Sequence, residues 1–439
     1  MDVFFKRHGG RLQANGADVR VIGDIRDAET LKPAWDQLAN RSGASAFAFP
    51  SWALARLGAE GGFSRPQLQL VTGWSGEELV AVGPFAAEVR CGLRHVRFLG
   101  APHSQPNRLV VAPGHDHAVI HIWEALRRHR SVLRLYAFDT RVQPSPLEAG
   151  SGWSGRVTSR SLVSIVDTTV ELEERLRHDH RDLRSVLVAR RRLADDTVSL
   201  EHRFGRSAAD AGALLPHLSA IEHHAGARHD PSPMQLDLLQ GRLPHMLQRA
   251  LAEGRLRLFV IIAAGVPLAY MIGLEGAGIV TALMTGHHED YRRYNPGHLV
   301  MTDLYCWAHR EGLPIDFSIG DLQWKRSWSR QGYEVADVLA ASDPLLLQAA
   351  NGAAAVHIAA RRLAARASSS GPRSATPSPA GRKPGRSPPG GSAPCVVSSG
   401  SRRIGTRPSS PERVPSCKVE ARRVPRMMGG GTSGPVRHR

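Results

Sequence analysis

The chain has 439 residues, 42% of them hydrophobic, which is enough for two ordinary domains with cores of normal size. Its net charge of +17 suggests nucleic acid or a membrane as a partner, but residues 367–439 hold 14 Lys or Arg against 2 Asp or Glu. Only +5 remains for residues 1–366. This distribution argues against a nucleic-acid-binding or membrane-surface function for that larger part.

The four cysteines form no C-x-x-C pair and no metal-ligand spacing, so we expect a reducing compartment and no bound metal. The N-terminal segment has no apolar core of signal-peptide length, and no window approaches the ~20 apolar residues of a membrane span. These features predict a cytoplasmic protein without a membrane span.

Strand-like and helix-like segments alternate through the first part of the chain, which indicates an α/β sheet with helices packed on it. Strands are expected at 18–25, 68–74, 78–89, 96–100 and 132–138, and helices at 27–42, after Pro50 and at 117–129.

A similar pattern restarts near Ser161. Strands are expected at 161–167, 198–204, 256–264, 266–276, 278–286 and 314–321, and helices at 168–196, 208–226, 233–254, 298–312 and within 346–366. The single Gly265 between two strands predicts a hairpin. In residues 367–439, 37 of 73 residues are Pro, Gly or Ser, a composition that predicts a disordered tail.

The segment from 278 to 299 has a pattern that suits an anion. A strand leads through "EDYRRYNPG" into a helix that starts near His298. The first turn of a helix offers unpaired N–H groups and partial positive charge, a natural place for a phosphate. Gly297 lets a ligand approach the backbone, and Arg292 and Arg293 can neutralise charge at the rim. Strand–PG–helix also describes many ordinary connections.

The stretch "FSIGDLQWKRSW", residues 317–328, places Lys325 just beyond the end of a buried strand. Ligands of open α/β sheets bind beyond strand ends, where neighbouring strands splay. Lys325 would lie near the phosphate site if the two strands are neighbours. Trp324 and Trp328, at helical spacing, are better explained as core residues than as a cage around the cation.

The run "YRRYNPGHLVMTDLYCWAHREGLPIDFSIGDLQWKRSW" resembles the C-terminal signature of the CelD/BcsL, or cellulose-biosynthesis-type, acyltransferases of the GNAT superfamily. The matching positions are Tyr294, Pro296, Gly297, Gly312, Asp316, Phe317, Gly320, Lys325 and Trp328. The usual Tyr before the Lys is Trp324 here, and the standard GNAT phosphate motif Q/R-x-x-G-x-G/A is replaced by "RRYNPG". The resemblance covers roughly residues 20–340 and also extends to the Fem-type aminoacyl ligases, which share the tandem layout.

This resemblance implies two tandem GNAT-like domains of α/β (α+β) class, each a mixed central sheet flanked by helices. The expected boundaries are 1–160 for a degenerate N-terminal domain, 161–345 for the acyltransferase domain, 346–366 for a helix and 367–439 for the tail. Acetyl-CoA or another acyl-CoA would be the co-substrate. The residues implied to bind it are Arg292, Tyr294, Asn295, Pro296, Gly297, His298, Leu299 and Lys325.

Transfer of an acyl group to an amine is helped by a general base. The candidates are Glu222 and His223 in "IEHHAGARH", which also contains His224 and His229, and Asp321 after the last core strand. The histidines could equally be a solvated helix end, and Asp321 could instead cap the next helix.

A run of arginines follows one predicted helix: Arg181, Arg184, Arg190, Arg191 and Arg192. These side chains form either a solvated face or a positive surface for CoA phosphates or an acidic acceptor. The leading hypothesis is an acyl-CoA-dependent N-acyltransferase acting on a small-molecule or glycan-related, cell-envelope amine. The alternatives are a Fem-like aminoacyl-tRNA-dependent transferase and a non-catalytic GNAT-like scaffold whose tail contacts nucleic acid or anionic lipid.

Overall fold

The computed structural model describes residues 11–14, 17–59, 66–101, 104–178, 181–196, 199–225, 233–320, 322–329 and 331–352. A helix is present at 344–352, where the last predicted helix begins. The predicted tail, 367–439, lies outside the described residues.

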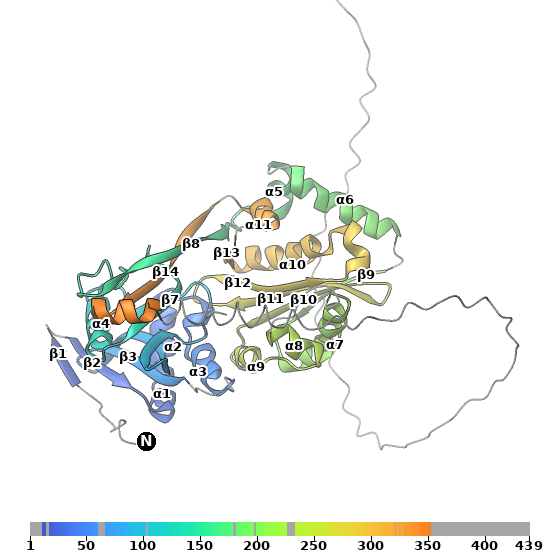
Figure 1. The fold of residues 1–439 in the computed structure, drawn as a ribbon. Coiled ribbons are helices and arrows are strands. Elements are labelled where there is room, and N and C mark those ends of the chain that lie inside the picture. Colours follow the sequence, from blue (N-terminus) through green and yellow to red (C-terminus); the bar gives the residue numbers. More distant parts are fainter. Residues whose placement is uncertain are drawn as a thin grey trace, which may run out of the picture.

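A mixed, 14-stranded sheet runs through the described part of the chain in the order β1-β2-β3-β4-β5-β7-β14-β8-β13-β12-β11-β10-β9, with β6 paired to β4 (Figure 1). The strands are β1 (Arg11–Ala14), β2 (Ala17–Ile22), β3 (Gln67–Ser75), β4 (Glu78–Arg90), β5 (Leu93–Phe98), β6 (Val110–Val111), β7 (Val132–Phe138), β8 (Ser154–Val166), β9 (Leu200–Gly205), β10 (Leu256–Ala263), β11 (Val266–Glu275), β12 (Val280–His287), β13 (Ile315–Ile319) and β14 (Gly332–Ala341).

Helices flank the sheet on both faces, as the mixed α/β prediction required. They are α1 (Ile25–Thr30), α2 (Lys32–Arg41), α3 (Pro50–Ala59), α4 (Ala118–Arg128), α5 (Leu172–His178), α6 (Arg181–Asp196), α7 (Ala208–Ala225), α8 (Pro233–Leu239), α9 (His245–Ala252), α10 (Pro296–Glu311) and α11 (Gln323–Trp328), with the 3₁₀ turns η1 (Ala46–Ala48) and η2 (Glu289–Tyr294). In the second half, α10 packs on β10 to β12 from one face and α7 from the other (Figure 1).

The expected helix at 168–196 corresponds to two helices, α5 and α6. Two other predicted helices are also each two helices in the structure. The expected helix at 27–42 breaks at Leu31, because Pro33 lacks an N–H and its ring clashes with the carbonyl four residues earlier. The expected helix at 233–254 separates into α8 and α9 around Gly241, which has φ +68°, and Pro244. Both breaks occur where a single residue cannot continue a helix.

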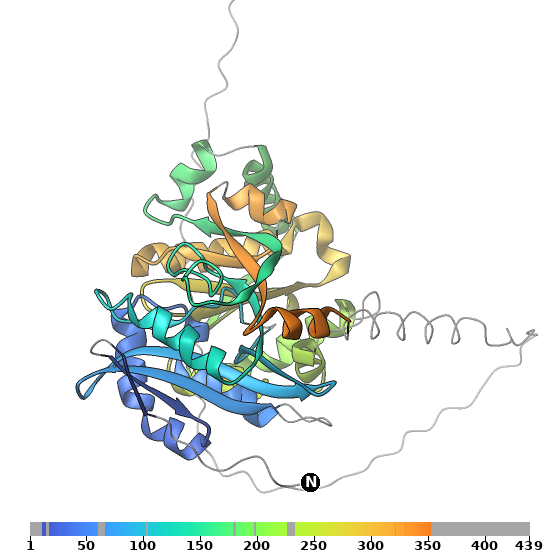
Figure 2. The same ribbon diagram turned by 60° about the vertical axis from the view of Figure 1, so that its left-hand side comes forward.

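The two predicted domains share one continuous sheet. Strand β14, from the end of the second half, lies between β7 and β8 and is antiparallel to both, with Ala336 opposite Phe138 on one side and Arg160 on the other. Strand β8 continues into the second half by pairing with β13. The helix at 344–352 packs against the N-terminal half, and Figure 2 shows it there in orange-red. Its Ala350 is buried in one cluster with Val132 of β7 and Ala341 of β14.

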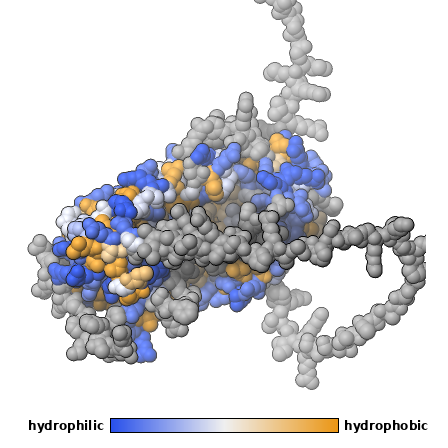
Figure 3. Space-filling view, in the orientation of Figure 1, coloured by the Kyte–Doolittle hydropathy of each residue, from blue (hydrophilic) through white to orange (hydrophobic). Residues whose placement is uncertain are grey.

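The described surface seen in Figure 3 is mostly hydrophilic, with an apolar group over the N-terminal half at the left of the view. No helix among the described residues is both long and apolar enough to cross a membrane.

Candidate active site

Strands β12 and β13 diverge after a short parallel contact. Their register contains only the pairs Val280↔Ile315 and Thr281↔Asp316, although β12 continues to His287. Strand β13 turns away through Ser318, which has φ +59°, and pairs with β8 at Ile319. The strands therefore splay at the edge of the sheet where the sequence predicted a ligand site.

A cavity of about 400 Å³ fills this splay. Its walls are residues 282–285 of β12 and 317–319 of β13, together with Met234 and Gln235 of α8 and Trp324 and Lys325 of α11. Gln105 of the N-terminal half completes it, and its carbonyl accepts a hydrogen bond from Ser318 Oγ at 3.0 Å. Both halves of the chain thus contribute to one cavity.

Lys325 lies in the cavity wall, yet its residue is only 6% exposed. Its Nζ donates to the carbonyl oxygens of Phe317 at 2.8 Å and Ile319 at 2.6 Å. Burial lowers the pKa of Lys325 to about 8, although the carboxylate of Asp316 acts in the opposite direction. The sequence predicted an ammonium directed at cofactor phosphates. In the structure the ammonium holds the end of β13, so a phosphate contact remains a prediction.

The two tryptophans of α11 pack, as predicted. Trp328 is 1% exposed and its Nε1 donates to Nδ1 of His298 at 3.1 Å, which joins α11 to the first turn of α10. Trp324 packs edge-on against Phe317 with a centroid distance of 5.1 Å. Trp324 therefore fixes α11 against β13, and Trp328 fixes it against α10.

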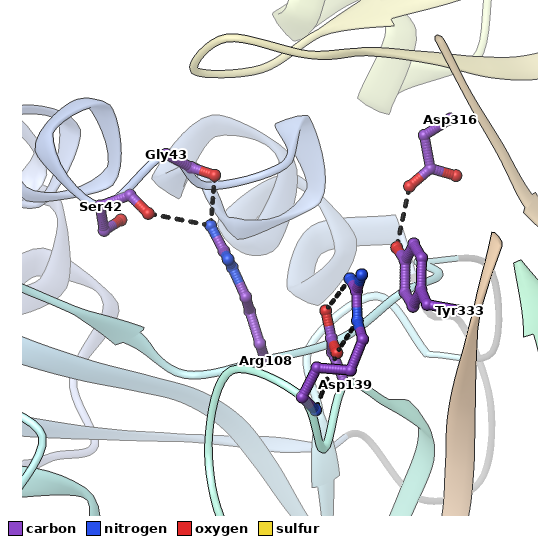
Figure 4. Close-up of polar contacts among 7 residues, drawn as sticks. Ser42, Gly43, Arg108, Asp139, Asp316 and Tyr333 are labelled. Atoms are coloured by element: carbon purple, nitrogen blue, oxygen red, sulfur yellow. Dashed lines mark hydrogen bonds and ion pairs between the residues drawn. The ribbon is translucent and has the colours of Figure 1, made fainter. Parts of the chain in front are cut away.

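Asp316, on β13, is fully buried beneath the cavity wall. It accepts a hydrogen bond from Tyr333 Oη at 3.0 Å (Figure 4). It accepts a second one from the Ser318 amide at 2.5 Å. Burial raises the pKa of Asp316 to about 6, against the lowering effect of these bonds and of Lys325 and Arg141. Asp316 and Lys325 therefore act on each other as opposite charges at the end of β13.

Glu222, one of the predicted bases, lies on α7 and is 2% exposed. Its Oε1 accepts a hydrogen bond from Tyr270, and Gln235, a cavity residue, also bonds to its carboxylate. Burial raises the pKa of Glu222, while these hydrogen bonds lower it. A Cβ on Gly286 would lie 2.6 Å from Oε1, so β12 can pass the carboxylate only because residue 286 is glycine.

His223, another predicted base, is exposed next to Glu222. The predicted base Asp321 and the neighbouring His229 lie outside the described residues. His224 instead stacks on His288 with ring centroids 4.0 Å apart. Among the described residues, no group of three or more His, Cys, Asp or Glu could hold a metal ion.

The predicted phosphate turn has the expected helix start. Asn295 adopts a left-handed conformation, with φ 47° and ψ 51°, and its carbonyl accepts from the amides of His298 at 3.0 Å and Leu299 at 3.2 Å. No described backbone group preceding the helix accepts from the Gly297 amide. Apart from its chain neighbours and the backbone of its own helix, no atom lies within 4 Å of the place where a Gly297 Cβ would be. Gly297 therefore offers the open backbone that an anion needs.

Some side chains of the predicted phosphate turn, residues 292–299, are exposed to solvent and others are buried in the core. Arg292 is exposed, with a 3.4 Å contact to Glu289. Tyr294 is buried and donates to Asp196 at 2.6 Å, and Pro296 and Leu299 are also buried. Of the basic helix α6, Arg191 and Arg192 are exposed. Tyr294, Pro296 and Leu299 thus shape the turn, whereas Arg292 and the Gly297 backbone face outward.

Several residues of the site carried no signal in the sequence. Gln235 and Tyr270 surround Glu222, and Gln105 comes from the other half of the chain. Only the expectation of a hairpin at 256–276 placed Tyr270 on a core strand, and no local pattern marks Gln105 as a cavity residue.

Comparison with known proteins identifies the class of the second half. A family model described as an acetyltransferase (GNAT) domain matches residues 181–326, which run from α6 to α11 and include the splayed strands. A search of curated proteins finds no match. The second half therefore has a GNAT-type acyltransferase fold.

Solved structures with similar folds include FemX, at 9% identity and a TM-score of 0.49, covering 70% of this chain and 95% of FemX. The C-terminal domain of a putative lysylphosphatidylglycerol synthetase from Agrobacterium fabrum is 12% identical, with a TM-score of 0.49 and coverages of 76% and 96%. A tandem GNAT protein from the clavulanic acid biosynthesis pathway is 14% identical, with a TM-score of 0.39 and coverages of 75% and 99%. At these identities and scores the similarities decide neither donor nor acceptor.

Proposed function

We propose that the protein is an acyl-CoA-dependent N-acyltransferase that transfers an acetyl or other acyl group to an amine. The observation that carries this proposal is the cavity between β12 and β13, with the buried carboxylate of Glu222 behind its Gln235 wall. A GNAT domain match over residues 181–326 supports the reaction class.

The donor is proposed to enter along the splayed strand edges. Backbone groups of diverging strands lack a ladder partner, so they can pair with the amide groups of an extended ligand arm. The pyrophosphate would then lie on the first turn of α10, at residues 294–299, with the Gly297 amide as a donor and Arg292 beside it. His298 links this turn through Trp328 to α11, which also carries Lys325 in the cavity wall.

The chemistry requires a new C–N bond and cleavage of the thioester C–S bond. The amine attacks the thioester carbonyl, the thiolate leaves, and the amine loses a proton. Glu222 is proposed to accept that proton through one bridging water, because Gln235 separates its carboxylate from the cavity. Its pKa, raised by burial, brings it closer to neutral pH, where a general base works best.

Strand β12 offers a donor for the developing oxyanion. Its register against β11 shifts between Ile272 and Gly273, opposite Met284 and Ala282, so Leu283 is the extra residue of a β-bulge. A bulged residue leaves the regular ladder. The amide of Leu283, in the cavity wall, is therefore our candidate for stabilising negative charge on the carbonyl oxygen.

The finer identity follows from the sequence motif. Its resemblance to CelD/BcsL-type acyltransferases favours acetyl-CoA as donor and a small or glycan-related amine as acceptor.

The experiment compares Glu222→Gln with His223→Gln in the full-length protein. Acetyl-CoA turnover with a panel of amines is measured over a range of pH by release of free thiol. We expect Glu222→Gln to lower kcat by roughly 10²- to 10⁴-fold, the usual contribution of a general base. The wild-type rate should rise as pH increases through the raised pKa of Glu222, and His223→Gln, at an exposed neighbouring position, should keep that profile.

Equal activity of Glu222→Gln and wild type at every pH would exclude Glu222 as the base. Absence of any acetyl-CoA-induced rise in Tm, together with a rise caused by charged tRNA, would replace the CoA proposal with the aminoacyl-tRNA route. If no donor raises Tm and no donor is turned over, the scaffold alternative is favoured.

A further inference from the structure

A row of polar side chains, here called the polar seam, leads from the cavity into the contact between the two halves. It consists of Ser318, Asp316, Tyr333, Arg141, Asp139 and Arg108. Ser318 in the cavity wall lies next to Asp316, which bonds to Tyr333, and the guanidinium of Arg141 stacks 3.1 Å from the centroid of the Tyr333 ring. Figure 4 shows Asp139 and Arg108 beside this stack, with Arg108 extending toward the loop after α2.

The charges of this seam do not balance. Arg141 forms a two-pronged contact with Asp139, from Nε to Oδ1 at 2.9 Å and from Nη2 to Oδ2 at 2.8 Å. Lys325 and Asp316 influence each other's pKa as opposite charges. The remaining cation, Arg108, has no carboxylate hydrogen-bonded to it among the described residues.

Arg108 makes hydrogen bonds through one nitrogen only. Its Nη2 donates to the backbone carbonyls of Ser42, at 3.1 Å, and Gly43. Within the described ranges, Nε and Nη1 have no hydrogen-bond partner. Burial lowers the pKa of Arg108, and the charge of Asp139 acts in the opposite direction. Because Asp139 already forms the two-pronged contact with Arg141, the positive charge of Arg108 is only partly offset.

The position of Arg108 relative to the cavity limits what could complete it. Gln105 forms part of the cavity wall, and three residues of extended chain span at most about 10 Å. The Cα atoms of Gln105 and Arg108 are therefore within about 10 Å of each other, a separation that a molecule of ordinary metabolite size can span. An amine placed in the cavity and a negative group against Arg108 can belong to the same acceptor.

We propose that Arg108, flanked by Arg141, is the anion subsite for an acceptor that carries a carboxylate or phosphate group besides its amine. The subsite rests on the proposed acyltransferase function, and it assigns the N-terminal half the task of acceptor recognition. Nε and Nη1 of Arg108 supply charge-assisted donors, which are stronger than neutral ones. Asp139 keeps Arg141 in place, so its unused Nη1 adds positive charge beside the subsite.

The test uses the full-length protein and two probes, inorganic phosphate and acetate, at constant ionic strength. Tm is recorded against probe concentration for wild type, Arg108→Gln and the control Arg128→Gln, which alters an exposed arginine on α4. Each titration is run with and without saturating acetyl-CoA. A ligand that binds only the native state stabilises it by RT ln(1 + [L]/Kd), so the rise of Tm with probe concentration reports the affinity.

We expect at least one probe to raise the Tm of wild type and Arg128→Gln equally, and Arg108→Gln to bind it at least ~10-fold more weakly, as for loss of a charge-assisted hydrogen bond. A phosphate effect indicates a phosphorylated acceptor, and an acetate effect a carboxylate-bearing one. If Arg108→Gln does not fold, Arg108→Lys keeps the charge but changes the donor geometry, and it should bind the probe with intermediate affinity.

The subsite is refuted if neither probe shifts wild type, or if Arg108→Gln and Arg128→Gln respond alike. A shift that disappears only when acetyl-CoA is added would mark the donor's phosphate site and also refute the subsite. The effect of acetyl-CoA alone on Tm reports on the proposed donor, so failure of that proposal is distinguished from failure of the subsite.

Discussion

At the scale of single residues, Lys325 combines a positive charge, almost complete burial and hydrogen bonds to strand carbonyls. The ammonium stabilises the end of β13, which forms one wall of the cavity. Sequence reasoning correctly placed this lysine at the start of a short helix beyond the last core strand. It could not show where the ammonium points, because Ser318, with φ +59°, turns the strand carbonyls toward the side chain.

The pKa of Lys325 predicts how stability depends on pH. The folded protein holds it at about 8, below the value of 10.5 for an unperturbed lysine, because burial disfavours the charged form. The cost of burying the charge is therefore fully present below pH 8 and is relieved as pH rises from about 8 toward 10.5. We expect the free energy of unfolding of wild type, relative to Lys325→Met, to increase over this range in urea titrations.

The matched control is Lys32→Met, which removes a lysine from a surface ion pair with Glu29. Exposed pairs of this kind contribute little to stability. If the free energies of unfolding of wild type and Lys325→Met differ by a constant amount between pH 8 and 10.5, Lys325 is not a buried cation in solution.

At the scale of elements, helix periodicity located most helices but not their breaks. The segment at 233–254 has apolar residues at helical spacing throughout, yet Gly241 and Pro244 divide it into α8 and α9. This division sets α8 against α7, where Met234 and Gln235 reach the cavity. The hairpin at Gly265 was predictable because glycine readily adopts the φ of +80° found there.

The link between α10 and α11 leads to a prediction for donor binding. Trp328→Phe keeps an aromatic ring in the core but removes the Nε1 donor to His298, which lies in the first turn of α10. We expect a loss of about 1 kcal/mol in the free energy of unfolding and weaker acetyl-CoA binding, by roughly 5- to 10-fold, as the turn at 294–299 loses its support. Calorimetry with acetyl-CoA measures the affinity.

Trp324→Phe serves as the control, because Trp324 lies in the same helix, α11, and its ring packs on Phe317 of β13. Similar losses of affinity in the two variants would show that α11 acts only through general packing. If acetyl-CoA affinity is unchanged in Trp328→Phe, the Trp328–His298 hydrogen bond does not position α10 for donor binding.

At the scale of the whole molecule, the family resemblance implied two tandem domains, each with a central sheet, and the structure joins these sheets into one. Strand β14 follows the second half in sequence but pairs with β7 of the first. Local pattern cannot reveal such a partner, since pairing depends on residues about 200 positions apart. For the same reason Gln105 and Arg108 could not be assigned to the site from sequence.

This shared strand predicts that the halves unfold together. Leu135, on β7, is 1% exposed and lies opposite Val338 of β14. Leu135→Ala should cost about 2–5 kcal/mol, because it removes buried apolar volume and leaves a cavity. Hydrogen exchange should then accelerate in both halves, because a strand held by both transmits the loss to each. The loss of protection, expressed as a free energy, should be the same in β10 and β11 as in β3 and β4.

The control is Leu345→Ala, at a residue that is 75% exposed, which should leave exchange unchanged in both halves. Acceleration confined to the N-terminal half would mean that β14 joins the two sheets without coupling their stability, and the anion subsite and the cavity would then lie on units that open separately.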